Sequence, residues 1–375
     1  MIRVLHLTGT SAVGDGVPAS LLAFYQKMDR TRFTFDLLTF SRGSLDYEPD
    51  FCALGGQVLR MSPPSARHLF KYVRELSDVF ARQPGYTVAH CHVPALCGPF
   101  FSAAKCAGVP LRILHSHSTA WSAGGWGKAL RNAVGTHMGR HAANAYMACS
   151  DEAADFLFGK REKAEIIPPA VDTGRLAFCT DVRAQTREIL GCREQLVIGH
   201  VGRFTPEKNH LFLLDVFSCL HRLYPESVLL LVGDGPQRAY VEKACREKGL
   251  GDAVRFVGTR RRIAPFLQAM DVFVFPSMFE GFGAALLEAL AAGLPCVVSD
   301  ALPHTAQLLP GVTVLPLYDS VESWAEQILA VRGRLPAPDL SARGCDVSVA
   351  AARLSRFYQA GLWRTDLLFR SNCDR

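Results

Sequence analysis

A glycine-flanked turn and a helical pattern, each of which carries a glutamate, follow the apolar segment Asp271–Pro276. The chain there reads Glu280-Gly-Phe-Gly and continues into a helical pattern that carries Glu288. A strand that leads through a glycine-flanked turn into a helix directs backbone N–H groups and the positive end of the helix dipole at one point, where a phosphate or an oxyanion can bind. Taken alone, a tight turn with a solvated glutamate explains the segment equally well.

Two basic residues follow a second predicted strand, about eighty residues upstream. Residues 196–202 form an apolar run, and Arg203 and Lys208 come directly after it with four residues between them. At the carboxyl end of a parallel strand, an arginine fork and a lysine point charge suit a pyrophosphate. This signal is also weak by itself, because basic residues at strand ends are usually solvated.

Length and composition indicate a globular protein with two domains. The 375 residues exceed one ordinary core, 49% of them are hydrophobic and 20% are charged. No apolar run is long enough to span a membrane, and the N-terminus reads as a first strand and not as a signal peptide. The twelve cysteines are scattered without a Cys-x-x-Cys pair, which favours reduced thiols and a cytoplasmic location.

Acidic residues are missing from one long stretch. No Asp or Glu occurs between Asp78 and Asp151, where the sequence has six basic residues, Arg82, Lys105, Arg112, Lys128, Arg131 and Arg140. A basic, acid-free face suits an anionic membrane or a phosphorylated substrate, and we expect peripheral contact with the inner face of the cell membrane. The alternative is chance combined with burial, since much of the stretch is apolar.

Strand patterns alternate with helical patterns along the whole chain. Such alternation of Val/Ile/Leu-rich strands with helices predicts an α/β fold with two parallel sheets, each covered by helices, hence two Rossmann-like domains. The strand–helix alternation pauses near residues 172–182. We therefore expect an N-terminal acceptor-binding domain over 1–175, a nucleotide-sugar-binding domain over 176–345, and a C-terminal helical segment over 346–375 that returns to the first domain.

The order of three motifs resembles a known family. Gly202-Arg203-x4-Lys208, Val232-Gly-Asp-Gly-Pro236 and Glu280-Gly-Phe-Gly-x4-Glu288 together are similar to the retaining, nucleotide-sugar-dependent glycosyltransferases of family four, which have the GT-B architecture of two domains facing across a cleft. Further segments, such as His115-Ser-His-Ser-Thr119, look like bacterial capsular or exopolysaccharide enzymes. Single motifs are weak, but their joint order is specific.

The resemblance implies roles for the residues singled out above. Arg203 and Lys208 should hold the donor diphosphate, Glu288 should accept hydrogen bonds from the ribose, and Glu280 should contact the donor sugar. The backbone amides around the sugar and phosphates should be those of Phe282, Gly283 and Ala284. His117 matches a histidine that contacts the transferred sugar near the acceptor, although His115 and His92 compete for that role.

A metal site is not expected. His90 and His92 would lie on one face of a strand, but no further zinc ligands are evident. The chain also has no Asp-x-Asp pair to hold a divalent ion under the phosphates, so the positive charge should come from Arg203, Lys208 and helix N-termini. The enzyme would then be a metal-independent, retaining hexosyltransferase, with the nucleotide sugar as co-substrate and no other cofactor.

One loop departs from the family pattern. Where the family has Gly-Gly-x-Glu, this chain has Asp15-Gly16-Val17-Pro18, so that only Gly16 remains as a donor-binding residue. Asp15 would repel a diphosphate unless it turns away, whereas Pro18 fits the first turn of a helix.

Three functions therefore stay open. The leading one is transfer of a sugar, from a UDP-sugar by expectation, to a growing lipid-linked cell-surface polysaccharide. The alternatives are a catalytically silent nucleotide-sugar-binding partner in a polysaccharide assembly complex and a sugar-nucleotide epimerase or phosphorylase of the same architecture, because a fold does not determine a reaction. No feature indicates nucleic-acid binding.

Overall fold

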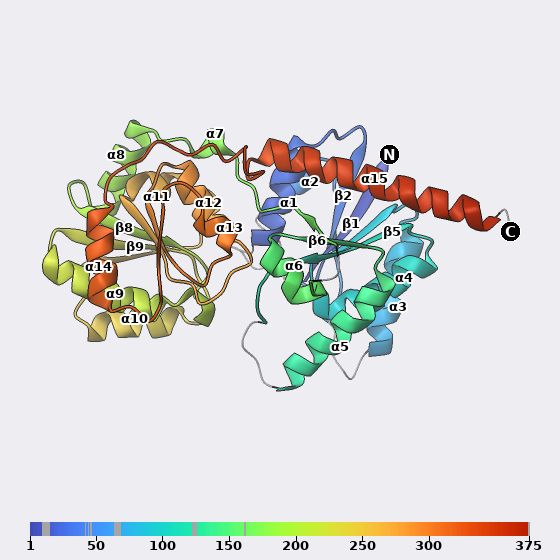
Figure 1. The fold of residues 1–375 in the computed structure, drawn as a ribbon, viewed down its shortest axis with the longest axis horizontal. Coiled ribbons are helices and arrows are strands. Elements are labelled where there is room, and N and C mark those ends of the chain that lie inside the picture. Colours follow the sequence, from blue (N-terminus) through green and yellow to red (C-terminus); the bar gives the residue numbers. More distant parts are fainter. Residues whose placement is uncertain are drawn as a thin grey trace. The chain divides into compact units, whose positions relative to one another are not determined.

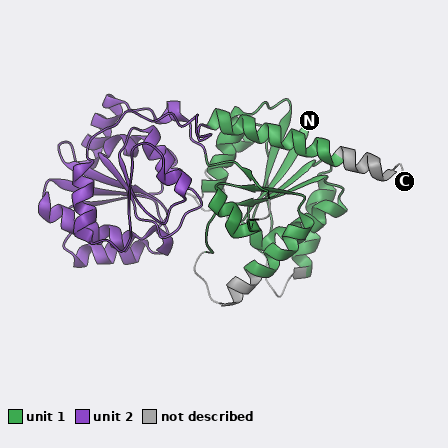
Figure 2. Ribbon diagram, in the orientation of Figure 1, with its two compact units in different colours: residues 1–169, 347–375 green, residues 170–346 purple. Residues whose placement is uncertain are grey.

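A computed structural model describes residues 1–9, 16–41, 43, 45, 47–63, 69–121, 126–160 and 163–373. The chain divides into two compact units (Figures 1 and 2). Unit 1 comprises residues 1–169 and 347–375, and unit 2 comprises residues 170–346. The expected boundary after residue 175 falls inside a short helix of unit 2, because Val171 already pairs with Asp346 in a parallel bridge. The prediction of two parallel-sheet, Rossmann-like domains is confirmed.

Unit 1 is built on a seven-stranded sheet whose pairs are all parallel, in the order β3-β2-β1-β4-β5-β6-β7. The strands are β1 (Ile2–Gly9), β2 (Phe33–Thr39), β3 (Val58–Arg60), β4 (Val88–Cys91), β5 (Leu111–Ser116), β6 (Ala145–Ala148) and β7 (Glu165–Ile166). The helices are α1 (Gly16–Lys27), α2 (Glu48–Ala53), α3 (Leu69–Arg82), η2 (Pro94–Leu96), α4 (Cys97–Cys106), α5 (Trp126–Ala142), α6 (Asp151–Phe158) and α15 (Val347–Cys373).

Helix α15 belongs to unit 1, although the residues directly before it in the sequence belong to unit 2. It packs against α1 and β5 and runs along unit 1 as a single long helix (Figure 1). The C-terminal segment, expected to be helical over 346–375, forms one helix from Val347 to Cys373. Tyr358 itself is fully buried against Phe33 and Phe35 of β2, so that this helix completes the core of unit 1.

Unit 2 has a six-stranded parallel sheet in the order β10-β9-β8-β11-β12-β13. Its strands are β8 (Leu196–Val201), β9 (Ser227–Val232), β10 (Val254–Gly258), β11 (Val272–Phe275), β12 (Cys296–Ser299) and β13 (Val312–Leu315). Its helices are α7 (Thr173–Leu176), α8 (Thr180–Leu190), η3 (Pro206–Lys208), α9 (His210–Leu223), α10 (Arg238–Glu247), α11 (Ala264–Ala269), α12 (Ala284–Ala291), α13 (His304–Gln307) and α14 (Val321–Ala330).

In each sheet, the direction in which successive strands are added reverses once, at a topological switch point. In unit 1 the chain runs from β1 to β2 on one side and later returns to β4 on the other; in unit 2 the same happens around β8, between β9 and β11. At such a switch point the loops that leave neighbouring strands diverge, and the carboxyl ends of the strands form the usual ligand-binding crevice of an α/β sheet. The predicted site residues of each unit lie at these edges.

Candidate active site

In unit 2, the loops after β8 and β11 bring the predicted site residues together. Arg203 and Lys208 follow β8, and Glu280 follows β11, its neighbour across the switch point. The two loops are joined directly, because the Met278 N–H donates to the Glu207 carbonyl at 2.8 Å. Two loops that are about seventy residues apart in the sequence are thus in direct contact.

Lys208 and Glu280 form an ion pair. The Lys208 ammonium donates a hydrogen bond to the Glu280 carboxylate, and both side chains are largely buried, with 18% and 13% exposed. The same ammonium lies 4.7 Å from the centre of the Phe275 ring, a cation–π contact. The pair therefore holds Glu280 in one place at the end of β11, and an anionic ligand at this edge would compete with the carboxylate for the ammonium.

Close backbone packing positions Arg203. A side chain at Gly233 would come within 2.0 Å of the Gly202 carbonyl oxygen, and one at Gly235 within 2.7 Å of the Phe204 backbone. The Phe204 N–H also donates to the Asp234 carbonyl at 3.0 Å. The Gly-Asp-Gly motif is thus explained by the approach of its loop to the segment that carries Arg203, whose side chain is exposed.

The turn before α12 requires glycine and opens a helix N-terminus. Gly283 caps α12 with φ of 95° and ψ of 75°, a left-handed conformation that other residues rarely adopt, and no side chain of the described residues caps this end. Phe282 is buried, and Ala284 begins the helix. The first N–H groups of a helix have no partner within it, so this terminus can receive an anion.

Glu288 lies on α12, one turn after Ala284. Desolvation raises the pKa of its carboxyl group from 4.5 to about 7. Among the described residues no hydrogen bond or ion pair engages this carboxylate. A desolvated acceptor close to a helix N-terminus is suited to binding hydroxyl groups, which would replace the water that it has lost.

We expect Glu288→Gln to increase stability at alkaline pH. The folded pKa lies above the unfolded value, so between pH 4.5 and about 7 the folded chain binds more protons, and the free energy of unfolding falls as the pH rises. The variant should melt like the wild type at pH 5 and be more stable by about 1–3 kcal/mol at pH 8. Thermal melts at both values, with the exposed Glu226→Gln as control, measure this. A difference in stability between the variant and the wild type that is the same at pH 5 and pH 8 would contradict this prediction.

His200 is a site residue to which sequence reasoning assigned no role, although it stands in the segment just before Arg203. It is fully buried, and its Nδ1 bonds to the Val274 carbonyl at 2.8 Å, which ties β8 to β11. Burial lowers the pKa of its imidazole to about 4. Its Nε2 has no partner among the described residues. The histidine thus adds a side-chain hydrogen bond between the two strands that lead to the ionic residues.

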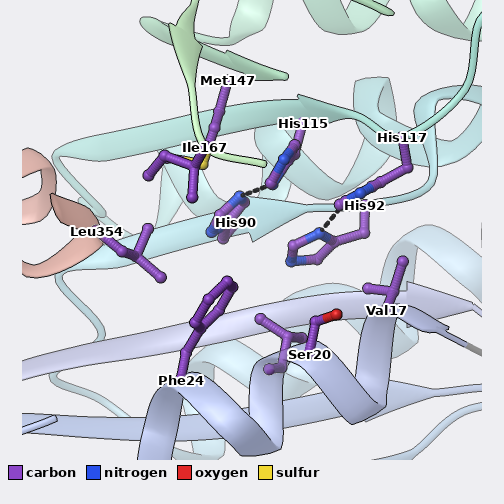
Figure 3. A pocket seen from close by; sticks show the side chains of 11 residues that line it. Val17, Ser20, Phe24, His90, His92, His115, His117, Met147, Ile167 and Leu354 are labelled. Carbon is purple, nitrogen blue, oxygen red and sulfur yellow. Dashed lines mark hydrogen bonds between the residues drawn. The ribbon is translucent and has the colours of Figure 1, made fainter. Parts of the chain in front are cut away.

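In unit 1, five histidine side chains lie together at the switch point of the sheet. His6 of β1, His90 of β4, His92 just after β4, His115 of β5 and His117 just after β5 form one cluster. All of these histidines except His6 line a pocket together with residues of α1 (Figure 3). His90 and His92 do share one face, with ring centres 4.3 Å apart. The sequence showed no further candidate ligands beside this pair, but the topology brings imidazoles from two neighbouring strands next to it.

The remaining predicted residues also lie in unit 1. Gly16 is the exposed first residue of α1, and Val17 and Ser20 of the same helix line the histidine pocket. Pro18 stands in the first turn of α1, as expected. Asp15 lies outside the described residues. His117 and helix α1, which begins at Gly16, thus share one pocket of unit 1, while the ionic residues belong to unit 2.

Comparisons with known proteins cover nearly the whole chain. Residues 14–175 match the family model Glycosyltransferase Family 4, and residues 195–332 match Glycosyl transferases group 1. The protein named "Putative glycosyltransferase EpsF" from Bacillus subtilis strain 168 is 33% identical over 333 residues, which cover 87% of this chain and 86% of that protein.

Two further similarities concern substrates. A UDP-Gal:alpha-D-GlcNAc-diphosphoundecaprenol alpha-1,3-galactosyltransferase from Escherichia coli is 35% identical over 142 residues, 37% of each chain. The crystal structure of Anabaena HepE in complex with UDP-glucose superposes with a TM-score of 0.74 at 18% identity, over 99% of this chain and 100% of that chain.

Among the described residues, no helix is both long and apolar enough to cross a bilayer.

Proposed function

Because this chain belongs to the group 1, family 4 glycosyltransferases, we propose that it moves a sugar from a UDP-sugar to a lipid-linked, growing cell-surface polysaccharide, with retention of the anomeric configuration. The observation that carries the proposal is the Lys208–Glu280 pair beside the N-terminus of α12. Two similar proteins support the choice of donor and acceptor: one was solved in complex with UDP-glucose, and the other is named as a galactosyltransferase for a diphosphoundecaprenol-linked acceptor.

In this proposal, unit 2 binds the donor. Arg203 and Lys208 neutralise the diphosphate, the amides of Phe282, Gly283 and Ala284 surround its oxygens and the sugar, and Glu288 accepts hydrogen bonds from the ribose. When the diphosphate takes the Lys208 ammonium, the Glu280 carboxylate becomes available to accept hydrogen bonds from the donor sugar. Unit 1 binds the acceptor and contributes His117.

The reaction breaks the bond between the anomeric carbon and the phosphate oxygen and forms a bond from that carbon to the acceptor oxygen on the same face. The acceptor proton passes to the leaving phosphate, so that UDP departs with the proton. Negative charge grows on the phosphate as the bond breaks, and two cations and a helix N-terminus are placed to stabilise it. The chain has no Asp-x-Asp pair, which supports a mechanism without a metal ion.

A panel of nucleotide sugars, each with and without a diphosphoundecaprenol-linked saccharide, tests the proposal. We expect UDP release with one UDP-sugar and only with the acceptor, and a product whose anomeric configuration, measured by NMR, equals that of the donor. Conversion of the donor without release would identify an epimerase. Donor binding without turnover for every acceptor would identify a silent binding protein.

We further propose that the chain works at the inner face of the membrane. Part of the acid-free stretch is not available for this contact, because three of its six histidines are buried and Arg112 donates to the backbone carbonyls of Val109 and Ala142. Arg82 and Lys105 are exposed. The side chains of Lys128 and Arg131 lie outside the described residues.

Sedimentation with lipid vesicles tests this location. We expect salt-sensitive binding to phosphatidylglycerol vesicles and little binding to phosphatidylcholine vesicles, because each basic residue near the surface contributes about 1 kcal/mol. Lys105→Glu should weaken the binding about fivefold or more, whereas Lys243→Glu, on α10 of unit 2, should not. Equal binding to both kinds of vesicle would show that the charge gap reflects burial alone.

A further inference from the structure

Three of the five histidines form a continuous hydrogen-bonded chain. His92 uses both ring nitrogens: its Nε2 contacts Nδ1 of His6 at 3.0 Å, and its Nδ1 contacts Nε2 of His117 at 2.8 Å (Figure 3 shows the second contact). His6 and His92 are buried, whereas His117, which follows β5, is partly exposed. The chain therefore leads from the interior of the sheet to the pocket at its carboxyl edge.

All three imidazoles are neutral at physiological pH. Burial lowers the pKa of His6 to about 3 and that of His117 to about 4, and it places the pKa of His92 well below the usual value. A neutral imidazole has one N–H and one bare nitrogen, so it donates on one side and accepts on the other. The tautomer of each ring in the chain consequently determines the tautomer of the next.

Only two proton arrangements satisfy both contacts. In the first, His6 donates from Nδ1 to His92, His92 donates from Nδ1 to His117, and the proton of His117 is on its own Nδ1. In the second, every proton is on the opposite nitrogen, and His6 carries an N–H on Nε2. That Nε2 is buried with no partner among the described residues. A buried N–H without an acceptor is rarer and less favourable than a bare ring nitrogen, so the first arrangement is preferred.

We propose that His92 is a positioning residue that holds His117 in the tautomer with its proton on Nδ1, so that this partly exposed ring presents an N–H donor to a sugar oxygen. That the acceptor of this N–H is a sugar oxygen rests on the proposed function. The tautomer of His117 does not, because it follows from the hydrogen bonds alone. The far end of the chain, His6, selects the direction of donation, and His92 transmits it. His117 would act on the substrate, and His92 would act only through His117.

The cluster also contains a second chain, which supplies a control. The Tyr358 hydroxyl contacts Nδ1 of His90 at 2.8 Å, and Nε2 of His90 contacts Nδ1 of His115 at 3.1 Å. This chain is equally buried, but no hydrogen bond among the described residues connects it to His117. Tyr358→Phe therefore disturbs the same core without changing the donor to His117.

The arrangement competes with metal binding. The ligand nitrogens of His92, His115 and His117 lie within 4.8 Å of one another, as do those of His6, His90 and His92. Contacts of 2.8 to 3.1 Å between ring nitrogens are hydrogen-bond distances, and each uses a lone pair that a metal would need. A bound transition metal and the proposed tautomer chain are thus alternatives.

Two variants of His92 separate the roles of its nitrogens. An asparagine side chain can place an N–H near the position of Nδ1, and so keep the donor to His117, whereas glutamine can reach only the position of Nε2. In protein labelled with ¹⁵N-histidine, a two-bond ¹H–¹⁵N spectrum reports the tautomer of each ring. We expect His117 to carry its proton on Nδ1 in the wild type, in His92→Asn and in Tyr358→Phe, and to lose that preference in His92→Gln.

Kinetics with the working donor and acceptor then connect the tautomer to the reaction. In His92→Gln we expect kcat to fall about 10- to 100-fold with little change in the KM for the donor, and in His92→Asn we expect most of kcat to be retained. Tyr358→Phe should keep kcat. Circular dichroism and melting temperature identify a variant that fails to fold.

Several outcomes would overturn the inference. A proton on Nε2 of His117 in the wild type, identical tautomers in the asparagine and glutamine variants, or a tightly bound equivalent of zinc in the purified protein would each exclude the proposed chain. The NMR result does not depend on glycosyl transfer. An Nδ1 proton in a protein that transfers no sugar would thus refute the proposed function and leave the positioning role of His92 intact.

Discussion

Glu280→Gln is expected to reduce kcat by about 10²- to 10³-fold while the protein keeps its fold. The carboxylate stands at the end of β11, fixed by the Lys208 ammonium, and the amide retains its shape and can still accept a hydrogen bond from the lysine. The amide lacks the charge, however, and it accepts weaker hydrogen bonds from the donor sugar. Turnover with a saturating UDP-sugar and a lipid-linked acceptor measures the effect.

The matched control for this variant is Glu207→Gln. Glu207 lies in the neighbouring loop and contributes its backbone carbonyl, not its side chain, to the contact with Met278. We expect that variant to transfer sugar at nearly the wild-type rate. Near-normal turnover of Glu280→Gln, at an unchanged melting temperature, would show that the ion pair serves stability and would remove Glu280 from the site.

Arg203→Ala is expected to weaken transition-state stabilisation by about 2–4 kcal/mol, whereas EDTA should change the rate little. Arg203 is exposed at the carboxyl edge of β8, on a segment held in place by the Gly233-Asp-Gly235 loop, so its removal should not disturb the core. The loss should appear in kcat/KM for the donor, because the charge of the leaving diphosphate is then stabilised by Lys208 and the α12 N-terminus alone.

Arg222→Ala, on the exposed end of α9, removes the same charge from the same unit away from the site and should leave kcat/KM unchanged. The EDTA arm is measured with the wild type after dialysis. Complete loss of activity that is restored by Mg²⁺ or Mn²⁺ would contradict the metal-independent mechanism, even if Arg203→Ala behaves as expected.

Motif order and periodicity predicted the fold class, which the structure confirms, and the candidate donor-binding residues of unit 2. Apolar runs such as Val272–Phe275 are found as strands at the predicted residues, because a strand buried on both faces is apolar throughout and is bounded by turn residues. The ionic residues Arg203, Lys208 and Glu280 each follow such a run directly. In a parallel sheet the carboxyl ends of the strands share one edge, so local sequence predicts that these three residues lie at the same edge of the sheet.

Other features depend on contacts between distant segments, and only the tertiary structure decided them. The strand order places β1, β4 and β5 side by side, and this order brings His6 to His92 and His92 to His117 across separations of 86 and 25 residues. Nothing in the spacing of histidines along the chain encodes the strand order, so the cluster could not be predicted.

The Lys208–Glu280 pair and the pKa of Glu288 have the same origin. Sequence reasoning assigned all three residues to donor binding, but whether two charges pair, or one carboxylate is desolvated, depends on how the loops after β8 and β11 and the helix α12 pack. Residue type and local pattern therefore determined which groups are present and at which strand ends. Packing determined which of them touch, which are buried, and hence which protons and charges are available for chemistry.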